Sequence, residues 1–189
     1  MRAGWWCMND LENFSAHRLL IVGGKAHVVQ TLRQVLGIVG VKHIQVVADP
    51  AAAVELLRTQ KFAAVLCDES AAGSGPRAFG YAARRTSGLL NPLLPIFLVC
   101  AGPRQCDVEA ARDLGYSDVL ARPLSAGTIL RKLKLALGKP RPFIASTDFF
   151  GPDRRALSRD GFGGPDRRTR KARQVKVGAP VVPDDEVLI

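Results

Sequence analysis

Between residues 17 and 138, short runs of consecutive apolar residues alternate with stretches in which apolar residues recur at helical spacing. Runs of the first kind predict buried β-strands, whereas apolar residues three or four positions apart predict amphipathic helices. The predicted strands cover residues 19–22, 44–47, 62–67, 95–100 and 118–120. Parallel strands that alternate with helices need a helix layer on both faces of their sheet. The pattern therefore predicts an α/β, doubly wound fold with a five-stranded parallel sheet.

Capping residues mark several ends of the predicted helices. Asp49 precedes Pro50, which is typical of a helix start, and Ser125 is expected to begin the last helix. Gly115 is expected to end the helix over about residues 104–114, because glycine adopts the left-handed conformation that follows many helices. Ligands of doubly wound folds bind at the carboxyl ends of the strands, so the residues at those ends are the candidates for function.

The predicted domain covers residues 17–138, between an N-terminal leader of residues 1–16 and a tail of residues 139–189. Residues 141–176 are basic and hold few aliphatic residues, so we expect the tail to be irregular, largely extended or disordered; its end, residues 180–189, is acidic and short. It repeats the sequence Gly-Pro-Asp-Arg-Arg, at residues 151–155 and again at residues 164–168. Four phenylalanines are expected to anchor the tail by packing on apolar surface: Phe143, Phe149, Phe150 and Phe162.

The 189 residues include 27 Lys and Arg against 17 Asp and Glu, for a formal net charge of +10. The charge favours anionic partners without identifying one. A hydrophobic content of 47% excludes a fully disordered chain, and the length excludes a large multidomain enzyme. No apolar stretch is long enough for a membrane span and no signal peptide is evident, so we expect a cytoplasmic protein. The cysteines and histidines lack metal-ligand spacing, so neither a zinc site nor a disulfide framework is expected.

The residues at the strand ends resemble those of a known family. The runs that carry the resemblance are Leu20-Ile21-Val22 in the first predicted strand, Val65-Leu66-Cys67-Asp68 in the third, Leu98-Val99-Cys100-Ala101 in the fourth and Leu120-Ala121-Arg122-Pro123-Leu124 after the fifth. They resemble the receiver domain of two-component response regulators, of the single-domain chemotaxis type, over residues 17–138. The resemblance implies a flavodoxin-like receiver fold with the strand order 2-1-3-4-5.

Receivers hold Mg²⁺ with an acidic pair after the first strand and accept a phosphoryl group on an Asp that ends the third. They read that group through a Thr or Ser and a Lys, which a Pro follows. The resemblance assigns Asp68 as the phosphoacceptor candidate and Pro123 as the family proline. The other pocket positions depart from the family pattern and hold Gly23, Gly24, Lys25, Cys100 and Arg122. The glycines replace the acidic pair, the cysteine replaces the Thr or Ser, and the arginine replaces the Lys.

These departures predict a degenerate phosphorylation site. Mg²⁺ requires oxygen ligands, so two glycines in place of carboxylates should leave Mg²⁺ binding weak or absent, and no cofactor is expected. Without the metal, the transferring phosphoryl group loses the main stabiliser of its charge. We expect Asp68 to pair permanently with Arg122, with Lys25 as a further cationic neighbour. Two alternatives stay open: Asp68 is only a strand-end cap, or it is phosphorylated in the ordinary way.

The function that these features predict is a non-enzymatic, protein-interaction module of bacterial two-component signal transduction, a pseudo-receiver without catalytic residues. Its partner is expected to be a protein such as a histidine kinase or a motor or regulatory protein. The alternative is an effector that binds an anionic ligand, a cyclic dinucleotide or a nucleic acid, through the tail. Paired arginines can bind phosphate or carboxylate through two parallel hydrogen bonds, and the candidates are Arg154, Arg155, Arg167 and Arg168.

Overall fold

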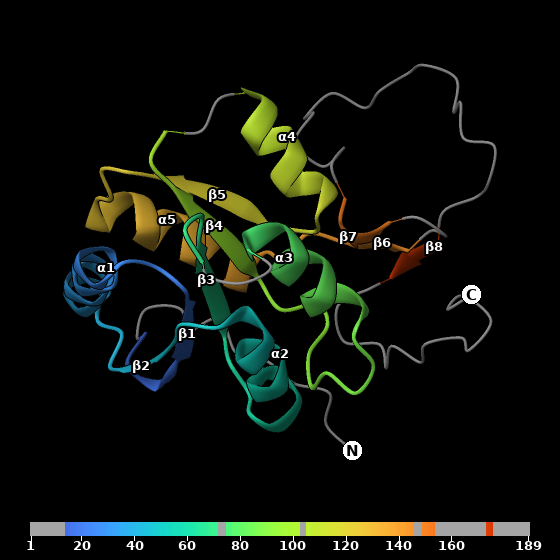
Figure 1. Cartoon of the computed structure of the whole chain (residues 1–189), viewed down its shortest axis with the longest axis horizontal. Helices are drawn as coiled ribbons and strands as arrows, with labels where there is room; N and C mark the ends of the chain where they lie inside the picture. The colour runs from blue at the N-terminus through green and yellow to red at the C-terminus, as the bar shows by residue number, and fades with distance from the viewer. Residues whose placement is uncertain (1–13, 72–74, 103–104, 146–148, 154–172, 176–189) are drawn as a thin grey trace.

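The structure is a computed structural model that describes residues 14–71, 75–102, 105–145, 149–153 and 173–175 (Figure 1). Along the chain it contains a short 3-10 helix (Phe14–Ala16), β1 (Arg18–Val22), α1 (Ala26–Val39), β2 (His43–Val47), α2 (Pro50–Thr59), β3 (Ala64–Asp68), α3 (Gly75–Arg85), β4 (Ile96–Cys100), α4 (Gln105–Asp113), β5 (Asp118–Ala121), α5 (Ala126–Gly138), β6 (Phe143–Ala145), β7 (Phe150–Pro152) and β8 (Arg173–Val175).

The first five strands form one parallel sheet in the order β2-β1-β3-β4-β5. In its centre Leu20 pairs with Gln45 of β2 on one side and with Val65 of β3 on the other. The predicted doubly wound α/β fold and its strand order are confirmed. Because all five strands run in the same direction, their carboxyl ends lie along a single edge of the sheet.

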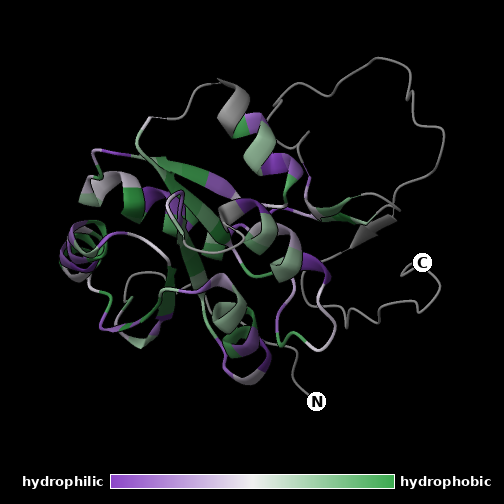
Figure 2. Ribbon diagram, in the orientation of Figure 1, coloured by the Kyte–Doolittle hydropathy of each residue, from purple (hydrophilic) through white to green (hydrophobic). Residues whose placement is uncertain are grey.

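The sheet is buried on both faces, as its apolar strands require (Figure 2). Leu20 and Val22 belong to a core under α2, α3 and α4, whereas Leu19 and Ile21 belong to a second core under α1 and α5. Successive side chains of a strand point to opposite faces, so one short run of apolar residues supplies both cores.

The helix ends follow the capping residues of the sequence. The carboxylate of Asp49 accepts hydrogen bonds from the backbone N–H groups of Ala51 and Ala52, each at 3.2 Å, at the start of α2. Ser125 caps α5 in the same way, and Gly115 follows α4 with a φ of +84°. These predicted boundaries are confirmed. The third strand was predicted over residues 62–67 but starts at Ala64. Phe62 is buried in the core although it precedes the first residue that pairs with a neighbouring strand, so its apolar character did not mark the strand boundary.

The segment after α5 forms an antiparallel three-stranded sheet, in the order β7-β6-β8, which the sequence analysis did not predict. Phe143 of β6 is buried, and its ring centroid lies 5.7 Å from that of Phe150 in β7. The expected anchoring of the tail is thus confirmed for Phe143, whereas Phe162 lies outside the described residues. A Cβ atom placed on Gly151 would lie only 3.0 Å from the Cα of Gly115, so β7 packs directly against the turn between α4 and β5.

Arg84 joins this added sheet to the parallel sheet. Its side chain is buried, and its guanidinium donates to the carbonyl oxygens of Gly115 at 2.9 Å and of Pro92 and Leu94 at 2.7 Å each. The same guanidinium lies over the ring of Phe143, 5.0 Å from the centroid. Burial lowers the pKa of Arg84 to about 9, so the group remains charged at neutral pH. One cation therefore holds two backbone segments, the loop before β4 and the turn before β5, together with a tail phenylalanine.

None of the helices in the described ranges is both long and apolar enough to cross a membrane.

Substitution of Arg84 tests its structural role. Arg84→Met should lower the free energy of unfolding by about 3 kcal/mol or more, because three carbonyl groups lose their donor in the interior. Arg84→Lys should recover part of the loss, since an ammonium group lacks the planar fork. The control is Arg85→Met, whose guanidinium lies over the exposed ring of Tyr81, with an expected loss of about 1 kcal/mol or less. Equal urea midpoints for the two methionine variants would contradict the prediction.

Candidate functional site

The residues proposed for the pocket come together at the carboxyl edge of the sheet. Asp68 ends β3 and is in register with Val99 of β4, while Cys100 ends β4 and is in register with Ala121 of β5. The backbone N–H of Arg122, directly after β5, donates to the carbonyl oxygen of Cys100 at 2.8 Å. The prediction that Asp68, Cys100 and Arg122 gather at one end of the sheet is confirmed.

Asp68 is completely buried, with an exposed fraction of 0%. Its Oδ1 atom accepts a hydrogen bond from the backbone N–H of Ser70 at 2.9 Å and a second, short one from the Ser70 hydroxyl. Its Oδ2 atom accepts none from the part of the chain that the structure describes. Asp68 therefore closes a local turn with Ser70 at the end of β3, with its carboxylate directed into the protein.

The expected ion pair between Asp68 and Arg122 is wrong. The Nη2 atom of Arg122 pairs with Oε1 of Glu69, and the same oxygen accepts from the backbone N–H of Ala101 at 2.8 Å. Side chains of consecutive residues at a strand end point in opposite directions. Asp68 points into the protein, and the longer, partly exposed side chain of Glu69 reaches Arg122. The pair joins the end of β3 to the end of β5.

Gly23 and Gly24 form the turn between β1 and α1, and both have positive φ angles, of +70° and +95°. A Cβ atom on Gly23 would lie 2.4 Å from the Cα of Ala71, closer than atoms can approach. A Cβ atom on Gly24 would lie 3.4 Å from the Cβ of Asp68. With this backbone neither position can hold an aspartate without strain, because the turn after β1 lies directly against the loop after β3.

The remaining pocket candidates differ in their exposure. Cys100 is buried, with 4% of its surface exposed, and belongs to the core under α2, α3 and α4. Lys25 is exposed at the N-cap of α1, and none of the contacts to Asp68 involves it. Pro123 is exposed and is joined to Arg122 by a cis peptide bond. The structure thus brings these residues to the same edge without making them neighbours of the carboxylate.

The side chains at this edge do not fit a magnesium ion. Mg²⁺ needs several oxygen ligands at short distance, and of the two carboxylates here Asp68 is bound to Ser70 and Glu69 to Arg122. Across the described residues, no three or more His, Cys, Asp or Glu side chains are grouped so that they could hold a metal.

A buried thiol and phenol lie behind Asp68, and the sequence analysis did not predict their contact. The side chain of Cys67 is hydrogen-bonded to that of Tyr116. Burial raises the pKa of the Cys67 thiol to about 12, and the nearby Asp68 raises it further, against the effect of the hydrogen bond. Burial likewise raises the pKa of Tyr116. Both groups therefore remain protonated and uncharged at neutral pH.

The four tail arginines, Arg154, Arg155, Arg167 and Arg168, lie outside the described residues, so their role stays a prediction. The described part of the first repeat ends at Asp153, whose backbone N–H donates to the carbonyl oxygen of Pro142 at 2.7 Å. In this repeat, residues 150–152 form β7 and pack against the parallel sheet.

Comparison with known proteins identifies the fold. No family model matches the sequence, and no curated protein is significantly similar to it. A protein from Chloroflexus aurantiacus J-10-fl, assigned as a response regulator, has a TM-score of 0.60 and 24% identity, over 65% of this chain and 98% of that one. A second similar structure is the receiver domain of sensor histidine kinase PA1611 from Pseudomonas aeruginosa PAO1, which has a magnesium ion in its active-site cleft. Its TM-score is 0.56 and its identity 24%, over 66% of this chain and 100% of that one. Chemotaxis protein CheY4 of Vibrio cholerae has a TM-score of 0.55 and 19% identity, over 62% and 96%. The chain therefore has the flavodoxin-like fold of receiver domains.

A double-mutant cycle distinguishes the observed contact of Asp68 from the one that the sequence suggested. Asp68→Ala and Ser70→Ala should couple by about 1 kcal/mol in the free energy of unfolding, because the Ser70 hydroxyl donates to the buried carboxylate of Asp68. Asp68→Ala and Arg122→Ala should couple by less than about 0.5 kcal/mol, since the two side chains are not in contact. The energies come from urea unfolding at neutral pH. A larger coupling with Arg122 than with Ser70 would reinstate the ion pair.

The raised pKa of Cys67 predicts a dependence of stability on pH. Between about pH 9 and 12 the folded chain keeps the thiol proton that the unfolded chain releases, so the stabilising contribution is complete below pH 9 and is lost as the pH rises. The free energy of unfolding of the parent relative to Cys67→Ala should be about 1 kcal/mol lower at pH 10 than at pH 8. An unchanged difference between the two proteins would show that the thiol titrates normally.

Proposed function

We propose that this chain is a receiver-fold signalling module that acts by binding a protein partner, without ordinary Mg²⁺-dependent phosphorylation of Asp68. The observation that carries the proposal is the complete burial of Asp68 beneath the turn formed by Gly23 and Gly24. A phosphoryl donor must reach a carboxylate oxygen in line with the bond that breaks, and a buried carboxylate offers no such approach.

The surroundings of Asp68 support this proposal. Its Oδ1 atom accepts two hydrogen bonds from Ser70. The turn after β1 holds Gly23 and Gly24, which have no side chain, at the positions where receivers have carboxylates. Mg²⁺ would lack most of the oxygen ligands it needs, and the charge of the transferring group would lack a counter-ion. Asp68 in this role closes a turn, which agrees with the strand-end cap that the sequence left open.

The two residues at the positions that would contact a phosphoryl group, Arg122 and Cys100, have other surroundings here. Arg122 is bound to Glu69, and Cys100 is a buried thiol, a much weaker hydrogen-bond donor than the hydroxyl of Thr or Ser. The ion pair between Arg122 and Glu69 links the ends of β3 and β5 without any added group. A partner would therefore recognise one constant arrangement of this edge, rather than a phosphorylated and an unphosphorylated one.

The partner classes remain those of the sequence analysis: a histidine kinase, or a motor or regulatory protein of a bacterial signalling pathway. Arg131 and Lys134 of α5 are exposed and favour a partner surface that carries carboxylates, whereas Lys132 of the same helix is paired with Asp118. The module makes and breaks no covalent bond in this role, so we assign it no catalytic residue.

Phosphorylation by a small-molecule donor tests the proposal directly. The full chain is incubated with acetyl phosphate and Mg²⁺, and its intact mass is measured with Asp68→Asn as the matched control. We expect no phosphoryl adduct on either protein, because Asp68 is buried and metal ligands are lacking. The receiver domain of PA1611, which holds Mg²⁺ in its cleft, serves as the positive control. An adduct on the parent that Asp68→Asn abolishes would overturn the proposal.

A further inference from the structure

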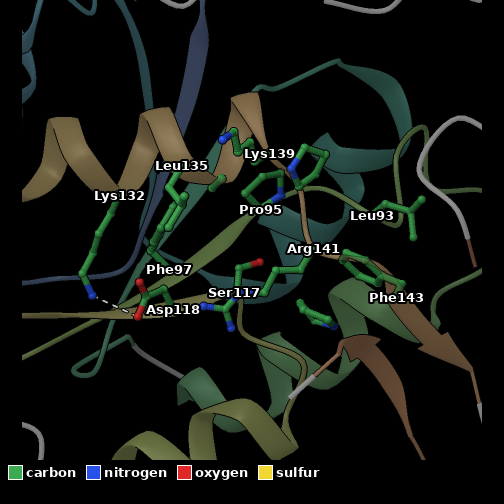
Figure 3. A pocket seen from close by; sticks show the side chains of 13 residues that line it. Leu93, Pro95, Phe97, Ser117, Asp118, Lys132, Leu135, Lys139, Arg141 and Phe143 are labelled. Carbon is green, nitrogen blue, oxygen red and sulfur yellow. Dashed lines mark ion pairs between the residues drawn. The ribbon is translucent and has the colours of Figure 1, made fainter. Parts of the chain in front are cut away.

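A hollow lies at the edge of the sheet opposite Asp68, between α5 and the segment that leads into β6 (Figure 3). We call it the α5 hollow. Its apolar wall is formed by Leu93, Pro95, Phe97, Leu135 and Phe143. Leu135 is 51% exposed, a large fraction for a leucine beside other apolar side chains.

The rim of the α5 hollow is positively charged. Lys139 and Arg141 line it, and no ion pair among the described residues involves either of them. Lys132 also lines it, but its ammonium group is held by Asp118 at 2.9 Å and by the carbonyl oxygen of Val119 at 2.6 Å. Asp118 is the one acidic residue of the lining in the described part of the chain. The hollow therefore suits an occupant that presents carboxylates beside aliphatic side chains.

The sequence contains such a segment in residues 184–189, which lie outside the described residues. It begins with Asp184, Asp185 and Glu186, the longest run of acidic residues in a chain of net charge +10, and continues with Val187, Leu188 and Ile189. Three carboxylates followed at once by three aliphatic side chains match a cationic rim beside an apolar wall.

The path of the chain brings this segment within reach of the hollow. Val175, the last residue of β8, pairs with Phe143 of β6, which forms part of the apolar wall. Residues 176–183 can span up to about 26 Å when extended. A tether of this length holds the attached segment near the hollow at an effective concentration on the order of millimolar.

From this charge complementarity and reach, we infer that residues 184–189 dock in the α5 hollow of their own chain. The acidic residues contact Lys139 and Arg141, and the aliphatic residues cover Leu135 and the wall beneath it. The docked segment occupies a surface that an acidic, aliphatic segment of another protein would otherwise bind. The inference concerns the edge of the sheet away from Asp68, so it does not depend on the proposed function.

The test uses the full chain and a fluorescent peptide of the sequence Pro-Asp-Asp-Glu-Val-Leu-Ile. In one variant, Asp184→Asn, Asp185→Asn and Glu186→Gln remove the tail charges. This variant should bind the peptide at least about tenfold more tightly than the parent, whose own segment competes for the hollow. Added salt should weaken the binding, because the contacts on the rim are exposed. Equal binding by parent and variant, or binding by neither, would overturn the inference.

Matched charge reversals locate the contact. In the background of the neutral tail, Lys139→Glu with Arg141→Glu should reduce peptide binding at least about tenfold, because both side chains line the hollow. The control, Arg33→Glu with Lys42→Glu, makes the same change in charge at exposed positions outside the hollow and should change binding less than about threefold. Equal losses from the two pairs would show that only the overall charge matters.

Carbodiimide cross-linking tests the same contact in the unsubstituted parent, so its result does not depend on any variant. An amide bond between Lys139 and a carboxylate of residues 184–186 should be found within single chains, at a yield independent of protein concentration. Cross-links found only between chains, at a yield that rises with concentration, would mean that the segment binds a second copy and would overturn docking within one chain.

Discussion

The close approach between the turn after β1 and the loop after β3 determines what the functional edge of this fold can do. Gly23 lies so near Ala71, and Gly24 so near Asp68, that the two segments meet with almost no intervening side chain. In a doubly wound fold this edge is where the strands open toward a ligand. Here the turn after β1 lies close to the loop after β3, and the buried carboxylate of Asp68 closes a turn with Ser70.

Periodicity was enough to predict the parallel sheet and its helices because both faces must be covered by apolar side chains. Local chemistry was enough for the caps, since Asp49 and Ser125 act on backbone groups two or three residues away. The ion pair of Arg122 could not be predicted in this way. Two acidic residues are adjacent at the end of β3, and only the direction of each side chain decides that Glu69 reaches the arginine. The backbone hydrogen bond from Ser70 to Asp68 could have been predicted, because an Asp side chain often accepts from the backbone N–H two residues further along.

Arg84 shows a second limit of reasoning from sequence. Arginine is rarely buried, so nothing in the helical pattern of α3 marks this residue as an interior one. Its burial depends on three carbonyl groups from distant parts of the chain and on Phe143, which the sequence places in a polar tail. The short strands of the tail were missed for a related reason: each has three residues, too few for a period to be recognised.

The residues after α5 give this chain a surface that its receiver-like part, residues 17–138, does not contain. Lys139, Arg141 and Phe143 line the α5 hollow, and the guanidinium of Arg84 holds Phe143 in place against the parallel sheet. The buried cation thus maintains the wall of the hollow as well as the packing of β6. At one edge of the sheet, the turn after β1 packs against the loop after β3 beside the buried Asp68. At the other edge, the segment between α5 and β6 lines a surface that is both charged and apolar.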